Sequence, residues 1–338
     1  MSKRHLLNIC ENLFISLLAA FTLTGCVTDD LTECPNDYEL KLVFDRNMLY
    51  ADAFASQVKS VDIKVFDSTT GREVYSFAES GTALEAEGYR VKLPIAPGTY
   101  DILCWAGMAE GNSFGYADPA ADILEHQSVR LITDDGVSAR RLNNLYHGLT
   151  SGAIFIDNNT IGSSQVQTAT VYLTKNTNRI CVMLLNLDGS EMKESDFSFS
   201  ITSPNGLMAY DNSFEPKVRV EYNPWHISPV ISETIAPAAT VQSAVAAEFS
   251  TGRLTADAGS RLDVNRLSDG ERIVSIPLER NLLLYKGAYH AYMSDQEYLD
   301  RQNDYVITFI LDKNNNWDKA AMIYINNWAT PPVQYQEW

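Results

Sequence analysis

Residues Tyr38 to Phe44 read YELKLVF, and their side chains alternate between apolar and polar. The apolar residues of this stretch fall on one face, and Glu39 and Lys41 fall on the other. Successive side chains of a β-strand point to opposite sides of the sheet, so this period of two is typical of a strand with one buried face. The stretch predicts a half-buried strand at the start of the folded chain.

Further stretches along the chain repeat this pattern. Val61 to Val65 (VDIKV) alternates in the same way, whereas Thr99 to Trp105 (TYDILCW) is apolar on both faces and predicts a strand that is covered on both sides. Only Asp295 to Arg301 has a helical spacing, and it is short. Many short strands at intervals of about 8 to 12 residues are typical of β-sandwiches. We therefore predict an all-β chain with two tandem β-sandwich domains.

The N-terminal segment predicts export and lipid attachment. Lys3 and Arg4 precede the apolar run Leu13 to Leu23, and Thr-Gly follows before Cys26. This run is too short to cross a bilayer core, which needs about 20 residues. Basic residues, a short apolar run and small residues before a cysteine are typical of a lipoprotein signal peptide. We predict cleavage before Cys26 and acylation of its thiol, in preference to a buried N-terminal helix.

The predicted organisation has four parts. Residues 1–25 form the signal peptide, 26–36 an acidic tether, 37–160 an N-terminal β-sandwich domain and 161–338 a C-terminal β-sandwich domain. The whole chain has a net charge of −17, and removal of the signal, which carries +1, leaves −18. An acidic body repels phosphate groups, so we expect no nucleic-acid partner and no docking on anionic lipid through a basic patch.

Three cysteines remain once Cys10 leaves with the signal and Cys26 is acylated. An oxidising envelope permits a disulfide bond. We favour a bond between Cys34 and Cys104, which would tie the tether to the first domain, and we expect Cys181 to be a buried thiol. Three cysteines cannot all pair internally, and the connectivity stays open at this point.

The sequence has no recognisable catalytic or metal motif. The histidines that follow the signal lie far apart, and HExxH, CxxC and GxSxG are absent. We therefore predict no enzyme activity, no catalytic residue, no cofactor and no metal site, although a carboxylate pair assembled from distant strands remains an alternative. Asp312 to Asn316 resembles the start of a calcium loop, but Trp317 stands where a glycine is required. A plain hairpin turn is the preferred interpretation.

Two other features are compatible with binding. The chain contains 17 Tyr and 5 Trp residues, which could stack on sugar rings, although in sandwiches they more often fill the core. Exposed strand edges can accept a strand from a partner chain. The clearest hairpin is the last one, in which Tyr305 to Leu311 and Ala321 to Trp328 flank a polar turn. It either exchanges a strand or closes the second sandwich.

Several segments together resemble a known family. They are CVTDDLTECP from Cys26, YELKLVFDRNMLYADAF from Tyr38, PGTYDILCWAG from Pro97, NNLYHG from Asn143 and LTKNTNRICV from Leu173. In this order and spacing they resemble the anchor subunits of Bacteroidetes fimbriae, the minor-fimbrium anchoring lipoproteins. The resemblance implies two transthyretin-like sandwich domains, acylation at Cys26, and a place at the base of a pilus that assembles by strand exchange.

The functional expectation follows from this resemblance. It implies a non-catalytic lipoprotein of the outer membrane, exposed at the cell surface, whose partners are fimbrial shaft or accessory subunits and, through Cys26, membrane lipid. No Arg or Lys lies between Cys26 and Lys41, so a processed shaft subunit, which loses a strand at a basic site, fits less well. A surface lipoprotein that binds glycans, or an adhesin at the fimbrial tip, is the alternative.

Overall fold

The computed structural model describes residues 36–162, 165–186, 190–215, 217–232, 242–318, 323–326 and 328–330. The chain forms two compact units. The smaller contains the residues up to Asp37 together with Ile156–Val166, and the larger contains Tyr38–Phe155 and the residues from Gln167 onward. All described strands belong to the larger unit. Within the described residues, no helix has the length and apolar character that a membrane span requires.

The described residues of the smaller unit include the short helix α3 (Asn158–Ile161). The side chain of Asp157 accepts a hydrogen bond from the backbone N–H of Asn159 and so caps the first turn. Gly162, with φ of 61°, ends the helix in the left-handed conformation.

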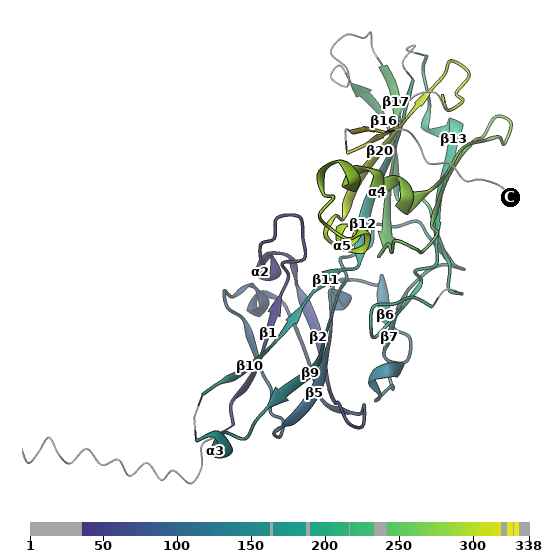
Figure 1. Cartoon of the computed structure of the whole chain (residues 1–338). Coiled ribbons are helices and arrows are strands. Elements are labelled where there is room, and N and C mark those ends of the chain that lie inside the picture. Colours follow the sequence, from purple (N-terminus) through teal and green to yellow (C-terminus); the bar gives the residue numbers. More distant parts are fainter. Residues whose placement is uncertain are drawn as a thin grey trace, which may run out of the picture. The chain divides into compact units, whose positions relative to one another are not determined.

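Two sheets form the first sandwich (Figure 1). The larger has the strand order β11-β9-β5-β2-β3, and the smaller has the order β10-β1-β4. Their facing residues form one apolar core, in which Leu40, Ile63 and Ile102 are completely buried. The strands are β1 (Tyr38–Val43), β2 (Ser60–Asp67), β3 (Glu73–Ser80), β4 (Arg90–Lys92), β5 (Gly98–Ala106), β9 (Tyr146–Phe155), β10 (Gln167–Tyr172) and β11 (Thr174–Lys175).

The strands predicted from alternation are confirmed here. YELKLVF forms β1, and its apolar side chains are buried whereas Glu39 and Lys41 are half-buried. Strand β5 is covered on both faces, because Ile102 packs in the core of the first sandwich and Leu103 and Trp105 pack in a second apolar cluster. The face of this sheet that points away from the sandwich core therefore also carries buried side chains, among them Trp105.

Strand β10 lies beside the first strand of the fold (Figure 1). It pairs in parallel with β1, from Tyr38 opposite Gln167 to Val43 opposite Tyr172. Strand β11 pairs with β9. The sequence interpretation assigned residues from 161 onward to the second domain, yet these two strands complete the sheets of the first sandwich.

Two more sheets form the second sandwich, with the orders β16-β17-β12-β20-β21-β22 and β19-β18-β13-β15-β8. Their core contains completely buried side chains such as Val182, Ile201 and Ile307. The all-β sandwich fold is thereby confirmed. The strands are β8 (Val137–Ser138), β12 (Thr177–Asn186), β13 (Phe197–Ser203), β15 (Val220–Tyr222), β16 (His226–Ser232), β17 (Gln242–Gly252), β18 (Arg261–Arg266), β19 (Arg272–Pro277), β20 (Asp304–Leu311), β21 (Ile323–Ile325) and β22 (Trp328–Thr330).

A fifth, small sheet joins strands from the two halves of the sequence. It has the order β14-β7-β6, with β6 (Phe114–Tyr116), β7 (Ser128–Leu131) and β14 (Leu207–Ala209). The two-residue strand β8 also joins the two halves, because it pairs in parallel with β15 of the second sandwich. As a result, Trp105 of β5 belongs to the same continuous apolar cluster as the core of the second sandwich.

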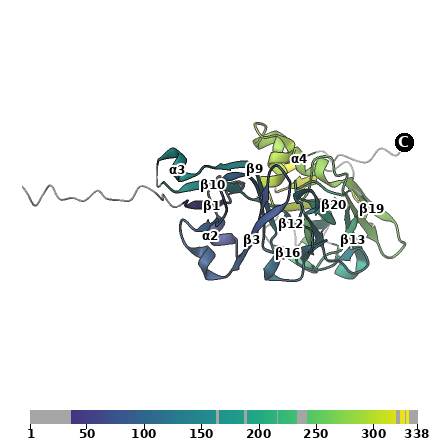
Figure 2. The ribbon, with the colours of Figure 1, turned by 90° about the horizontal axis from the view of Figure 1, so that it is seen from below.

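Helices are few, but one of them was not predicted. Helix α4 (Leu278–Tyr289) has twelve residues, whereas the sequence analysis found no helical segment of that length. It lies beside β20 in both views (Figures 1 and 2). Leu278 and Leu282 are buried and anchor it, and Gly287 weakens its helical pattern. Helix α5 (Asp295–Arg301) covers the short stretch whose helical spacing the sequence analysis noted without predicting a helix. The remaining helical turns are α2 (Phe54–Gln57) and the 3₁₀ segments Thr82–Glu85, Met108–Glu110, Leu124–His126 and Glu194–Asp196.

Candidate functional site

The predicted lipidation and disulfide residues are only partly described. Cys26 and Cys34 lie outside the described residues. Cys104 lies in β5, is completely buried in the core of the first sandwich and has a free thiol. Burial, and to a smaller extent the carboxylate of Asp62, raise the pKa of this thiol. Its pairing with Cys34 stays a prediction.

The C-terminal hairpin contributes to the core of the second sandwich. Strand β20 lies between β12 and β21, and its residues Ile307 and Phe309 are completely buried. The polar turn after it is closed by Asp312, whose Oδ1 accepts hydrogen bonds from the backbone N–H groups of Asn314 and Asn316 at 2.8 and 2.9 Å. Of the two roles considered for this hairpin, β20 has the one that closes the sandwich.

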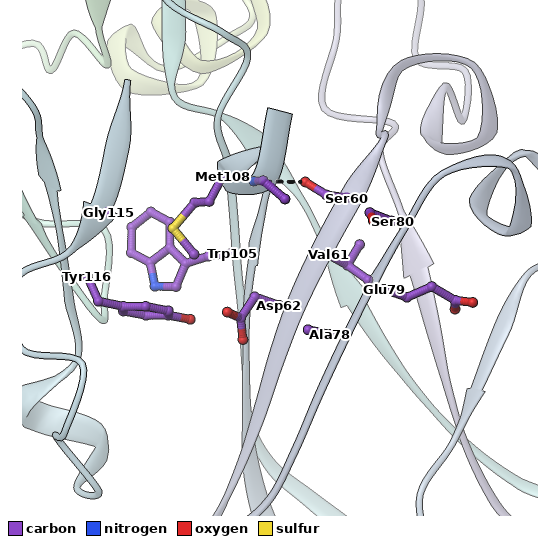
Figure 3. Close-up of a pocket in the computed structure, with 11 residues that line it drawn as sticks. Ser60, Val61, Asp62, Ala78, Glu79, Ser80, Trp105, Met108, Gly115 and Tyr116 are labelled. Atoms are coloured by element: carbon purple, nitrogen blue, oxygen red, sulfur yellow. Dashed lines mark hydrogen bonds between the residues drawn. The ribbon is translucent and has the colours of Figure 1, made fainter. Parts of the chain in front are cut away.

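A pocket of about 410 Å³ lies on the outer face of the five-stranded sheet of the first sandwich (Figure 3). Strands β2, β3 and β5 form its floor, and β6 and the turn Met108–Glu110 form its other wall. The residues that line it are Ser60, Val61, Asp62, Ala78, Glu79, Ser80, Trp105, Met108, Ala109, Gly115 and Tyr116.

Strand register explains why the central residues meet. Asp62 of β2 is paired with Trp105 on one side and with Ala78 on the other. Directly paired residues point to the same face of a sheet, so these three side chains form a row across the pocket floor. Ala78 is small and lies in the outer strand β3, which leaves space beside the Asp62 carboxylate. Tyr116 reaches the same space from β6 (Figure 3).

The polar groups of the pocket are unevenly satisfied. Trp105 is completely buried, and its Nε1–H has no hydrogen-bond partner among the described residues. Figure 3 shows this nitrogen on the edge of the indole nearest Tyr116, and shows the Tyr116 hydroxyl and the Asp62 carboxylate pointing toward each other. Ser60 Oγ accepts a hydrogen bond from the backbone N–H of Ala109 at 3.3 Å. A buried donor without a partner is costly, because it has given up its hydrogen bond to water.

The charge of Asp62 is only partly balanced. Burial raises the pKa of Asp62, against smaller lowering effects of the Tyr116 hydroxyl and of Lys64. Burial, followed by the Asp62 carboxylate, raises the pKa of Tyr116. The Nζ of Lys64 already pairs with Glu73 at 3.0 Å and lies 5.0 Å from the centre of the Tyr116 ring. The pocket therefore presents a carboxylate without a dedicated counter-ion.

A buried histidine packs against the tryptophan. The rings of His147 and Trp105 lie 4.6 Å apart, edge to face. His147 Nε2 lies 2.7 Å from the carbonyl oxygen of Tyr210, which can only accept, so Nε2 carries the proton. Burial lowers the pKa of His147 to about 4. The imidazole is therefore neutral at physiological pH and holds the Trp105 ring in place.

Sequence analysis identified none of these pocket residues as a site. It placed Asp62 on the polar face of VDIKV and Trp105 on the second apolar face of TYDILCW, so both were recognised as pointing away from the sandwich core. Their juxtaposition depends on the pairing of β2 with β5. Alternation reports the face of each residue but not the register between strands, so the pocket could not be found from it.

One outer strand is long enough to receive another chain. Strand β3 ends the five-stranded sheet and, with eight residues, is the longest outer strand in the part of the chain that the structure describes. Its first residue, Glu73, is bonded to the carbonyl of Asp122, whereas Val74 is 51% exposed. An outer strand presents backbone N–H and C=O groups along its free edge and so can pair with a further strand.

Comparison with known proteins adds the family. The model of the family described as Fimbrillin-A associated anchor proteins Mfa1 and Mfa2 matches residues 31–331. The chain belongs to this Mfa2 family. The resemblance inferred from the sequence motifs is thereby confirmed, and the chain is a fimbrial component of the anchor and adhesin type. A search of curated proteins found no match.

Solved structures include full-length relatives of this Mfa2 family member. A proposed adhesin of Bacteroides thetaiotaomicron is 31% identical, with a TM-score of 0.80 over 90% of this chain and 100% of the other. A proposed polysaccharide-binding protein of the same organism is 26% identical, with a TM-score of 0.72 over 89% and 99%. The fimbrial anchor protein Mfa2 of Porphyromonas gingivalis is 16% identical, with a TM-score of 0.67 over 89% and 100%, and shares the fold.

Proposed function

We propose that the chain is a non-catalytic lipoprotein of the outer membrane that anchors or assembles a fimbrium by strand exchange with other fimbrial subunits. The observation that carries this proposal is the match to the fimbrial anchor family over residues 31–331, which includes both sandwiches. The site contributes no competing chemistry, since the pocket pairs one carboxylate with aromatic and aliphatic walls.

Lipid attachment is supported by the N-terminal sequence. A basic start, a short apolar run and Cys26 are the features that lipoprotein processing requires. Two or three acyl chains anchor a protein stably, because each buried methylene contributes about 0.8 kcal/mol. The absence of Arg and Lys between Cys26 and Lys41 favours a retained anchor over a subunit that is cleaved on assembly.

Strand exchange requires a free edge, and we propose β3 as the acceptor. Its length and the exposure of Val74 support this choice. A lysine on an outer strand opposes the addition of a further strand, because its charge would have to be desolvated at the new interface. The change Val74→Lys should therefore weaken assembly without disturbing the core.

The test is co-purification of the tagged chain from outer-membrane extracts of its own cells. We expect wild type to recover a ladder of fimbrial subunits and Val74→Lys to recover markedly less. The matched control is Leu267→Lys, since Leu267 is 55% exposed but lies in the turn between β18 and β19. If wild type recovers no fimbrial subunit while it is folded and acylated, the anchor proposal is wrong. If wild type recovers fimbrial subunits and Val74→Lys recovers as many, the choice of β3 as the acceptor strand is wrong.

A further inference from the structure

The pocket beside β3 contains groups that one small chemical group could satisfy together. Trp105 Nε1–H has no hydrogen-bond partner among the residues that the structure describes, and the Asp62 carboxylate is an acceptor. The Tyr116 hydroxyl, which can both donate and accept, faces Asp62 (Figure 3). A group that accepts from the indole and donates to the carboxylate matches this arrangement. A hydroxyl does both, whereas an ammonium only donates and an ionised carboxylate or phosphate only accepts.

The walls of the pocket add a second requirement. Met108 and Tyr116 present apolar and aromatic surface beside the polar centre, and the buried ring of Trp105 lies beneath it. The C–H faces of a pyranose ring pack against such surface while its hydroxyls point to polar groups at the edge. The volume of about 410 Å³ is within the range of about 300 to 1,000 Å³ that is usual for small-molecule sites.

Charge excludes the main competing ligands. An anion would meet the carboxylate of Asp62, and the nearby cation Lys64 is already paired with Glu73. Glu79 adds no charge to the pocket, because its carboxylate accepts a hydrogen bond from the Tyr89 hydroxyl and points away from Asp62 (Figure 3). A cation would leave the indole N–H unsatisfied. We propose that this pocket binds a neutral pyranose, one hydroxyl of which accepts a hydrogen bond from Trp105 Nε1–H and donates one to Asp62. This inference is independent of the fimbrial role, because it uses neither the edge of β3 nor Cys26.

The first experiment is saturation-transfer NMR on the mature chain with D-glucose, D-galactose, D-mannose and N-acetyl-D-glucosamine as separate probes. We expect at least one sugar to receive saturation from the protein and to shift the indole N–H resonance of Trp105, assigned by its loss in Trp105→Phe. Because the ligand is neutral, its affinity should be the same at low and high salt. If no sugar receives saturation and the indole resonance does not move, the pocket holds water only and the proposal is overturned.

Two variants locate the binding. Asp62→Leu removes the acceptor of the proposed hydrogen bond and Tyr116→Phe removes the hydroxyl that faces it, each with a side chain of almost the same shape. We expect Asp62→Leu to weaken sugar binding by roughly tenfold or more. Tyr75→Phe is the matched control, because Tyr75 lies in β3 and packs on the opposite face of the sheet. Thermal unfolding of all three verifies that they fold. Equal affinity of Asp62→Leu and wild type would contradict the proposal, whatever the outcome of co-purification with fimbrial subunits.

Discussion

At the scale of single residues, two glycines explain parts of the motifs that indicated the family. Gly107 ends PGTYDILCWAG with φ of +88°, and a Cβ there would lie 1.9 Å from the carbonyl oxygen of Asn144. Gly148 ends NNLYHG, and its Cβ would lie 2.5 Å from a methyl group of Val171. No other residue fits either position, because a side chain would overlap backbone or core atoms. These motifs therefore record close approaches between strands rather than chemistry.

His147 predicts a pH dependence of stability. Its pKa is lowered from 6.5 to about 4, mainly by burial and then by the charges of Arg253 and Arg46, although the carbonyl of Tyr210 and the charge of Asp211 act in the opposite sense. The unfolded chain takes up a proton at the ordinary pKa and the folded chain does not, so stability falls as the pH falls from about 6.5 to about 4. We expect a loss of roughly 3 kcal/mol in the free energy of unfolding that is due to this residue.

Urea unfolding at pH 7 and pH 4 measures this effect. The difference between the two free energies of unfolding should be smaller for His147→Gln than for wild type. The exposed His226 provides the control, and His226→Gln should retain the wild-type dependence. Parallel pH profiles for wild type and His147→Gln would show that the prediction is wrong.

At the scale of elements, alternation identified β1 and β2 because each has one buried face with a period of two, and short apolar runs identified β5 and β20. It did not identify α4, whose run Leu282–Leu284 and Gly287 obscure a helical period. Alternation also could not predict that β1 pairs with β10 or that Asp62 lies beside Trp105. Such contacts join residues far apart in the sequence, and their register is decided by packing rather than by local pattern.

The position of β20 permits a direct test of strand exchange. Cys181 of β12 lies directly opposite Val306 of β20, and both are half-buried. Neighbouring strands are about 4.8 Å apart, which is within reach of a disulfide bond. We expect Val306→Cys to form a bond with Cys181 on oxidation and to lock β20 in its sheet. Since β20 already closes the second sandwich, the locked protein should recover as many fimbrial subunits as wild type.

Mass spectrometry under non-reducing conditions verifies the bond, and Cys181→Ser combined with Val306→Cys is the unlocked control. Loss of subunits from the locked protein, but not from the control, would mean that β20 leaves its sheet during assembly.

At the scale of the whole molecule, the apolar core does not stop at the boundary between the sandwiches. Phe66 and Trp105 of the first half share one cluster with Ile180 and Phe309 of the second. Buried amides reinforce this link, since Asn176 Nδ2 donates to Asn212 Oδ1 at 2.6 Å. The sequence analysis divided the chain into two domains near residue 160. Because the two sandwiches share this apolar core, we expect them to unfold together.

Attachment to the membrane is the prediction that belongs to this scale. Cys26→Ala removes the thiol that we propose to be acylated, and we expect the variant to leave the membrane fraction together with its fimbriae, because a chain with a net charge of −17 is repelled by anionic lipid. Fractionation and the mass of the N-terminal peptide measure this. Retention of Cys26→Ala in the membrane fraction, or an unacylated wild-type peptide, would contradict lipid anchoring.

The parallel pairing of β1 with β10 also affects how the molecule carries tension. Strand β1 starts next to the predicted tether, and the chain continues from the far end of β10 into the second sandwich. A pull between the tether and the second sandwich would act on opposite ends of two parallel strands. The hydrogen bonds from Tyr38 to Val43 would then be loaded in shear, all at once, instead of being opened one after another. The joint nearest the predicted tether thus has a shear geometry, which resists mechanical force better than the opening of one bond after another.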